Sequence, residues 1–133
     1  MERPGIAFLF LMLLVAPAYA LDCPKGLEFS FVSSADITDT AATTITGATG
    51  VAGKKYYITS WSISNTDATV GTRVDLFTGS THRDSLPAAS LFGGAVKPYP
   101  VPIVSGVNEA IKCQNATNSA EVRCSVQGCL LGQ

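Results

Sequence analysis

The sequence predicts an all-β protein: an antiparallel β-sandwich or jelly roll of about seven short strands. Composition is the first observation behind this. After residue 20, Ser and Thr supply 25 of 113 residues and Gly another 11, which suits strands and turns and disfavours long helices. The second observation is that short runs of alternating apolar and polar residues recur along the chain, separated by turn-forming residues.

The first 20 residues predict a signal peptide. Fifteen of them are hydrophobic, Ile6–Val15 is an unbroken apolar run, and Ala18-Tyr19-Ala20 offers the small residues that signal peptidase accepts. Ten helical residues reach only about half of a ~30 Å hydrocarbon core, so a retained anchor is the weaker interpretation. We therefore expect cleavage before Leu21, a secreted or periplasmic product with no membrane attachment, and one domain over residues 21–133.

Alternation places the strands of the first half. Leu27–Val32 predicts a half-buried strand, and the Thr- and Ile-rich segment Ile37–Thr46 predicts another, followed by a glycine-rich turn over residues 47–53. Lys54–Ser64 gives the strongest signal, because both of its alternating sets carry bulky side chains. We expect this strand to be central, with Tyr57 and Trp61 in the core rather than on an exposed sugar-binding platform.

The second half is less regular. Arg73–Thr78 predicts a strand after a turn at residues 65–67, whereas the polar stretch Gly79–Ser90 predicts a loop. In Ala95–Val104 the prolines at positions 98, 100 and 102 each remove a ladder donor, so the segment predicts an edge strand or an extended connection. Two cysteine-bearing strands, at residues 110–113 and 121–127, close the chain on either side of a turn-rich segment.

The four cysteines of the mature chain predict disulfides, because an even number in an exported domain is typical of pairing. Zinc is a weaker interpretation, since no histidine lies near them and they do not form two close pairs. Cys113 and Cys124 fall on the apolar faces of consecutive strands, which predicts that they pair across a hairpin. Cys23 would then pair with Cys129 and join the two ends of the mature chain. No cofactor or metal site is predicted.

Few residues suggest chemistry, and His82 is the only histidine. It lies with Asp84 and Ser85 in the predicted loop, so the three residue types of a Ser/His/Asp hydrolase occur together there. The sequence around them does not contain the nucleophile elbow of such an enzyme. We therefore predict no catalytic residues. Asn115-Ala116-Thr117 is a glycosylation sequon at the predicted hairpin tip, where Asn115 would be accessible. The net charge of −1 gives no reason to expect nucleic-acid binding.

From about Ile37 to Gly128 the chain resembles the small β-sandwich proteins of tailed bacteriophage virions, which are head decoration, head fibre or tail-associated domains. The similarity is carried by a Thr/Ala-rich opening, a small-Gly-basic-aromatic-Ile lead into a main strand, a turn, a strand, and the approach to a closing hairpin, found here at Thr38–Ile45, Ala52–Ile58, Ser64–Ala68, Val74–Phe77 and Asn108–Ala110.

The resemblance implies a non-enzymatic structural or binding module on a particle surface, working as a trimer or in repeated copies with protein partners or a cell-surface ligand. Together with the signal peptide, it suggests an exported relative encoded by a phage or prophage and acting at the host envelope. Two alternatives stay open at this stage. One is the hydrolase centred on His82, and the other is a periplasmic or extracellular adhesion domain with no relation to phage.

Overall fold

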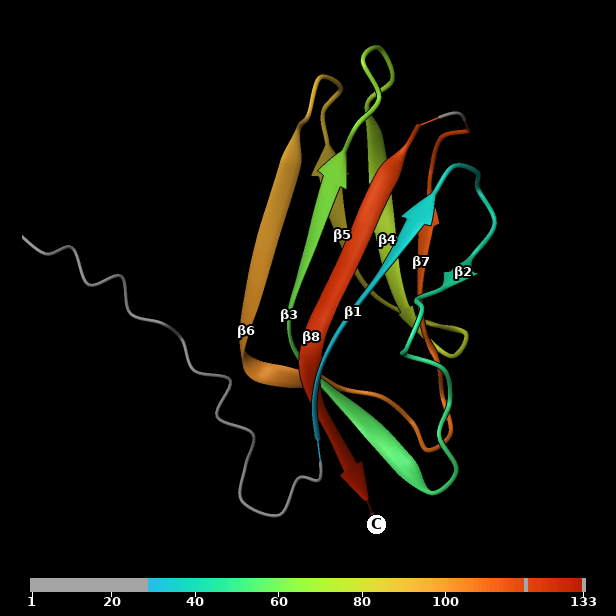
Figure 1. Cartoon of the computed structure of the whole chain (residues 1–133), viewed down its shortest axis with the longest axis vertical. Helices are drawn as coiled ribbons and strands as arrows, with labels where there is room; N and C mark the ends of the chain where they lie inside the picture. The colour runs from blue at the N-terminus through green and yellow to red at the C-terminus, as the bar shows by residue number, and fades with distance from the viewer. Residues whose placement is uncertain (1–28, 119, 133) are drawn as a thin grey trace, which may run out of the picture.

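The computed structural model describes residues 29–118 and 120–132 (Figure 1). The predicted signal peptide, its cleavage position and Cys23 lie outside the described residues. Eight strands are present: β1 (Phe29–Ile37), β2 (Thr43–Thr44), β3 (Lys54–Asn65), β4 (Thr72–Thr78), β5 (Thr81–Ala88), β6 (Gly94–Val104), β7 (Ile111–Asn115) and β8 (Val122–Gly132).

The strands form two four-stranded antiparallel sheets, with orders β1-β8-β3-β6 and β2-β7-β4-β5. The strand pairs are nested: β1 pairs with β8, β2 with β7, β3 with β6, and β4 with β5. This nesting of eight strands in two sheets is the arrangement of a jelly roll. The predicted all-β antiparallel sandwich is therefore confirmed.

The core lies between the two sheets, where the inward residues of both meet. Its largest fully buried apolar side chains come from five strands and the loop after β2: Ile37, Ile45, Ile58, Trp61, Val74, Leu76, Ile111, Val122 and Val126.

Strand β3 occupies the predicted interior position, between β8 and β6. Its pairing register shifts between Ile58 and Ser60, which marks a β-bulge. Without the bulge, Ile58 and Trp61 would face opposite sides of the sheet, whereas with it both are fully buried. The bulky residues that alternate in two sets along this segment therefore belong to one inner face, which the bulge interrupts. Trp61 lies in the core as predicted, whereas Tyr57 is only half-buried.

The bulge also explains why a glycine stands opposite it. Gly128 of β8 pairs with Ile58, and a Cβ atom at Gly128 would lie 1.9 Å from the Tyr57 carbonyl oxygen. Only a residue without a side chain lets β8 pass this close to β3.

Two expected elements differ from the structure. The strand predicted over Ile37–Thr46 is reduced to β2, because the Asp39 carboxylate accepts the backbone N–H of Ala41 at 2.9 Å and turns the chain. The loop predicted over Gly79–Ser90 is wrong, since most of it forms β5, which pairs with β4 through a tight turn. Strand β5 is an edge strand with mostly polar residues, so its sequence does not show the alternation of apolar and polar residues that predicts a strand.

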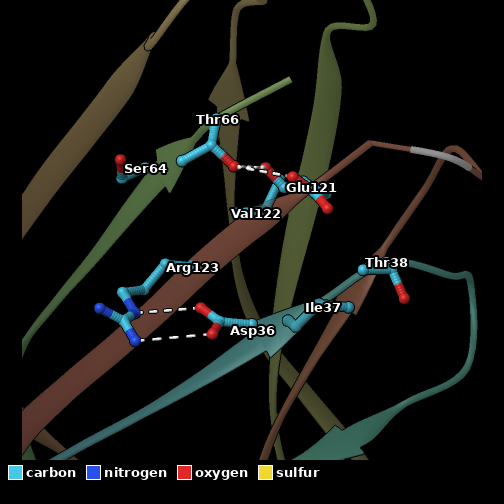
Figure 2. Close-up of a pocket in the computed structure, with 8 residues that line it drawn as sticks. All are labelled: Asp36, Ile37, Thr38, Ser64, Thr66, Glu121, Val122 and Arg123. Carbon is cyan, nitrogen blue, oxygen red and sulfur yellow. Dashed lines mark hydrogen bonds and ion pairs between the residues drawn. The ribbon is translucent and has the colours of Figure 1, made fainter.

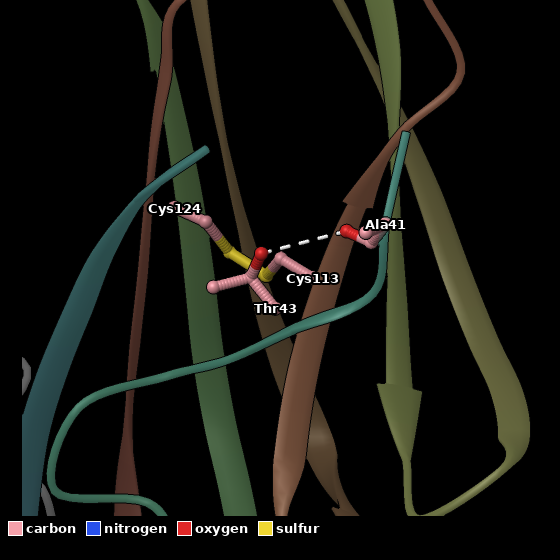
Figure 3. Close-up of a disulfide and its surroundings, with 4 residues drawn as sticks. All are labelled: Ala41, Thr43, Cys113 and Cys124. Atoms are coloured by element: carbon pink, nitrogen blue, oxygen red, sulfur yellow. Dashed lines mark hydrogen bonds between the residues drawn. A yellow bond between two sulfur atoms is a disulfide. The ribbon is translucent and has the colours of Figure 1, made fainter. Parts of the chain in front are cut away.

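The disulfide between Cys113 and Cys124 is present, with a Cα–Cα distance of 6.6 Å and both residues fully buried (Figure 3). The predicted pairing is confirmed, but the predicted hairpin is wrong. Cys113 lies on β7 and Cys124 on β8, which belong to different sheets, so the bond crosses the core. Alternation shows which residues face inward but not which sheet each strand joins.

Cys129 is also on β8 and fully buried. Because Cys23 lies outside the described residues, its pairing with Cys129 remains a prediction.

Candidate functional site

The only histidine lies in a small polar cluster on β4 and β5. Ser85 stands opposite Asp75 in the ladder, and a register shift between Leu76 and Phe77 inserts one extra residue next to His82. This bulge brings His82 and Ser85, which are three residues apart, to the same side of the strand. His82 Nε2 lies 2.9 Å from Ser85 Oγ, and the Ser85 hydroxyl donates to Asp75 Oδ1 at 2.5 Å.

The order of these groups differs from that of a catalytic triad. In a triad the imidazole stands between serine and carboxylate and accepts the serine proton. Here the Ser85 hydroxyl lies between His82 and Asp75 and donates its hydrogen bond to the Asp75 carboxylate, while His82 Nε2 lies 3.7 Å from Asp75 Oδ1. Asp75 is also held by Arg73 through two hydrogen bonds, of 2.9 and 3.1 Å. Partial burial raises the pKa of Asp75, but the bonds from Arg73 and Ser85 outweigh burial and leave the pKa below its usual value.

A second polar cluster joins the edge strands β5 and β6 across the open side of the sandwich. Asp84 accepts a hydrogen bond from Lys97 Nζ at 2.9 Å and a short one from the Tyr99 hydroxyl. We call Asp84, Lys97 and Tyr99 the clasp. Strands β5 and β6 belong to different sheets and do not pair with each other, so the clasp supplies a side-chain connection between the two sheet edges.

Burial and charge perturb the ionisation of the clasp. Burial raises the pKa of Asp84, but the hydrogen bonds from Lys97 and Tyr99 outweigh burial and lower the pKa overall. The pKa of Tyr99 is raised well above its ordinary value, first by burial and then by its bond to the Asp84 carboxylate. Both shifts favour a charged Asp84 and a neutral Tyr99 at neutral pH, so the clasp is a structural connection rather than an acid–base pair.

A shallow hollow of about 430 Å³ lies where β1 and β3 end and β8 begins (Figure 2). Arg123 and Asp36 face each other on one side of it, with Nε and Oδ1 3.0 Å apart. On the other side the Thr66 hydroxyl lies 3.3 Å from the Glu121 carbonyl oxygen. The charged groups Arg123 and Asp36 thus bond each other, Thr66 bonds Glu121, and none of the lining residues holds a buried polar atom without a partner.

Exposed apolar side chains are concentrated in one segment. Among the residues whose side chains the structure describes, which begin at residue 35, the large hydrophobic side chains that are exposed are Leu91, Phe92, Val96, Val101 and Val104. All five belong to residues 91–104, which comprise the β5–β6 loop and β6. Scattered exposed apolar residues need no explanation, but a gathering in one segment is typical of an interaction surface.

Leu91 and Phe92, which we call the tip, are 68% and 79% exposed and have left-handed backbones with φ of 59° and 63°. This conformation costs a residue with a side chain roughly 1–2 kcal/mol. Burial of the tip side chains within the domain does not offset that cost, because both project into solvent. Strain of this kind persists only where the surrounding structure imposes it.

Hydrogen bonds around the tip hold its backbone in the left-handed conformation. The Leu91 N–H donates to the Asp67 carbonyl at 2.8 Å, and the Asn65 N–H donates to the Gly93 carbonyl at 2.8 Å. The β3–β4 and β5–β6 loops are therefore hydrogen-bonded to each other, and both lie at the upper end of the molecule in Figure 1. Backbone N–H groups of Thr69 and Val70 bond the Asp67 carboxylate, which lowers its pKa and orders the first loop.

The glycosylation sequon does not present its asparagine. Asn115 is 1% exposed, and its Nδ2 donates to the carbonyl oxygens of Ile37 at 3.2 Å and Ala120 at 2.9 Å. The expectation that Asn115 is accessible is therefore wrong. The sequence places it at a turn, but it is the last residue of β7, and its amide group holds the ends of two other elements together.

No group of three or more His, Cys, Asp or Glu side chains that could hold a metal ion occurs within residues 29–118 and 120–132. The same residues contain no helix long and apolar enough to cross a bilayer. Comparison with protein-family models and with curated proteins gives no match to this sequence.

Sequence reasoning missed the exposed apolar segment. It predicted either an edge strand or an extended connection at Ala95–Val104, and the structure has the edge strand, since β6 lies at the end of its sheet. It did not identify the tip, because a Leu-Phe pair normally indicates core. The available signal was local: Leu91 and Phe92 stand between Ser90 and a pair of glycines, in a stretch too short to form a strand.

Proposed function

We propose that the chain is an exported, non-enzymatic binding module that attaches to its partner through the tip. The partner is a protein or a cell-surface ligand. The setting is that of the phage virion surface, decoration or attachment proteins that the sequence resembles, working in repeated copies. The observation that carries the proposal is the tip itself, where two large apolar side chains are held in solvent on a strained backbone.

The strained backbone of Leu91 and Phe92 supports a binding role for their side chains. Asn or Gly would adopt the same left-handed backbone at lower cost, and polar residues would suit an exposed loop. Leu and Phe are unfavourable in both respects, so their presence is best explained by contacts made outside the domain. Phe also supplies a large apolar area with only two side-chain torsions to order on binding.

A binding isotherm tests the proposal. Labelled mature protein is titrated onto cells of the encoding organism, comparing the unaltered chain with Leu91→Asn/Phe92→Asn. We expect saturable binding that weakens at least tenfold in the variant, while its thermal stability is unchanged or higher. Ala42→Glu/Thr46→Glu is the matched control, because both residues are exposed and lie near β2, away from the tip. Equal binding by the tip variant would refute the proposal.

The alternative of a small hydrolase rests on the cluster of His82, Ser85 and Asp75, because the fold brings these three residue types within reach of one another. The test is turnover of activated ester substrates by the purified chain. A hydrolase requires turnover that is lost in both His82→Ala and Ser85→Ala. From the order of the three groups we expect no turnover above that of Ser85→Ala.

A further inference from the structure

The hollow at the ends of β1 and β3 and the start of β8 is lined by hydrogen-bond donors and acceptors together. Asp36, Arg123 and Ser64 stand side by side in the ladders of three neighbouring strands, and all three are exposed. On the other side of the hollow, Thr66 Oγ1 lies 3.4 Å from Glu121 Oε2 (Figure 2). The volume of about 430 Å³ falls within the roughly 300–1,000 Å³ of small-molecule sites.

The charged pair of the hollow keeps hydrogen-bonding capacity for a ligand. Arg123 gives Asp36 two hydrogen bonds, of 3.0 Å from Nε and 3.5 Å from Nη2. A guanidinium carries five N–H donors and a carboxylate has about four acceptor positions, so this pair uses only part of what it offers. The two side chains are 59% and 71% exposed, so a ligand reaches them without opening the domain.

The charges of the hollow select a neutral ligand. Among its lining residues, the carboxylates of Asp36 and Glu121 outnumber the guanidinium of Arg123, so an anionic group would meet net repulsion. A metal ion would find too few ligands, because residues 29–118 and 120–132 contain no group of three or more His, Cys, Asp or Glu that could hold one. A ligand of the hollow is therefore bound by hydrogen bonds rather than by its charge.

The apolar lining of the hollow argues against a protein side chain as its occupant. Protein interfaces are anchored by large apolar or aromatic side chains that fill desolvated pockets. Ile37 and Val122, the apolar residues of the lining, are each 1% exposed and offer almost no surface to such an anchor. Carboxylates and a guanidinium suit neighbouring hydroxyl groups, because a carboxylate accepts from two hydroxyls and a guanidinium donates in a fork. Rows of adjacent hydroxyl groups are characteristic of sugars.

We propose that the hollow binds a neutral saccharide of the cell surface. The tip is joined to the hollow, because the residues on either side of Thr66 are hydrogen-bonded to the backbone of Leu91 and Gly93. A sugar chain that leaves the hollow across this loop meets the exposed ring of Phe92, which offers an apolar surface to the C–H groups of a sugar ring. The inference rests on the proposed function, because it names the class of cell-surface ligand to which the module attaches.

Chemical treatment of cells tests the class of ligand. Labelled mature chain is titrated onto cells of the encoding organism before and after mild periodate oxidation, which cleaves the bond between neighbouring hydroxyl-bearing carbons. Cells exposed to iodate, the spent reagent, are the control. We expect periodate to weaken binding at least tenfold and iodate to leave it unchanged. Binding that survives periodate would overturn the inference but would leave the proposed function standing.

Variants of the hollow test the location of the site. The probe is an array of neutral and sialylated oligosaccharides, to which the labelled mature chain is applied. We expect binding to a subset of the neutral sugars, weakened at least tenfold in both Arg123→Gln and Asp36→Asn with unchanged circular dichroism. Asp39→Asn is the matched control, because Asp39 is an exposed carboxylate that bonds the backbone of its own turn. If Arg123→Gln fails to fold, Asp36→Asn decides the location.

The array also separates this inference from the proposed function. The absence of binding to any neutral sugar would overturn the saccharide site, and so would equal binding by the hollow variants and the control. Because the array contains no cells, sugar binding that depends on Arg123 would stand even if the chain did not bind cells. Cell binding that depends on the tip but not on Arg123 would leave the proposed function standing and overturn the saccharide site.

Discussion

The two halves of the sandwich are held together by different chemistry. On the side of β7 and β8, the buried disulfide between Cys113 and Cys124 links the sheets through the core. On the side of β5 and β6, the link is the polar clasp of Asp84, Lys97 and Tyr99.

Among the side chains that the structure describes, from residue 35 onward, the large apolar ones that are exposed all lie on the second side, in residues 91–104. Both halves contribute buried apolar residues to the core, but within those described side chains only the half held by the clasp also exposes large ones. The comparison suggests that the disulfide-linked half stabilises the domain, whereas residues 91–104, which we call the display edge, present apolar side chains to a partner.

The largest expected effect is on the covalent side. Cys113→Ala/Cys124→Ala should lower the free energy of unfolding by about 3 kcal/mol, because the disulfide closes a loop of 11 residues in the unfolded chain. Chemical denaturation monitored by Trp61 fluorescence measures this. A loss below about 1 kcal/mol would show that the half of the sandwich containing β7 and β8 does not depend on its crosslink.

A smaller effect is expected on the clasp side. Asp84→Asn keeps the size of the side chain but removes the charge that Lys97 and Tyr99 bind. We expect a loss of about 1–2 kcal/mol in the free energy of unfolding by the same measurement. Asp39→Asn is the matched control, because Asp39 is exposed and bonds only within its own turn. Equal losses of stability in the two variants would show that the clasp does not stabilise the domain.

Acid should weaken the display edge. The pKa values of Asp75 and Asp84 are lower in the folded chain than in the unfolded chain. Their contribution to stability is therefore complete above the unfolded value and is lost as the pH falls below about 4. Unfolding measured between pH 7 and pH 2.5 should show this decline, and Asp84→Asn should make the decline shallower. A parallel decline in that variant would contradict the assignment.

The smallest effect on stability is expected at the tip. Leu91→Asn/Phe92→Asn should leave the free energy of unfolding unchanged or raise it by up to about 1 kcal/mol, because Asn tolerates the left-handed backbone better than Leu or Phe. Thermal denaturation of the variant beside the unaltered chain measures this. A clear loss of stability would mean that the tip side chains support the domain, which would weaken the argument that they face a partner.

In both halves the sequence predicted the features that depend on local patterns. Alternation around Cys113 and Cys124 identified the disulfide, because both residues face inward whatever sheet they join. The prolines at 98, 100 and 102 identified an edge, since missing N–H groups exclude a strand interior. Predictions of this kind depend only on the local sequence and hold whichever sheet the strand joins.

Sequence reasoning failed where the outcome depends on distant contacts. The segment Gly79–Ser90 was expected to be a loop, because the bulge at His82 breaks the alternation of β5 and its polar residues face solvent. Asn115 was expected to be exposed, but its amide bonds carbonyl groups that come from other elements. The tip was not foreseen, because its backbone is set by hydrogen bonds from the β3–β4 loop.

The most direct test of the account is site-specific photocrosslinking at the tip. A photoreactive phenylalanine analogue is introduced at position 92, or at the exposed position 46 as the control, and each protein is irradiated on cells of the encoding organism. The account predicts adducts from position 92 that excess unaltered protein competes away, and none from position 46. Adducts of equal yield from both positions, or none from position 92 under conditions where the protein binds, would contradict it.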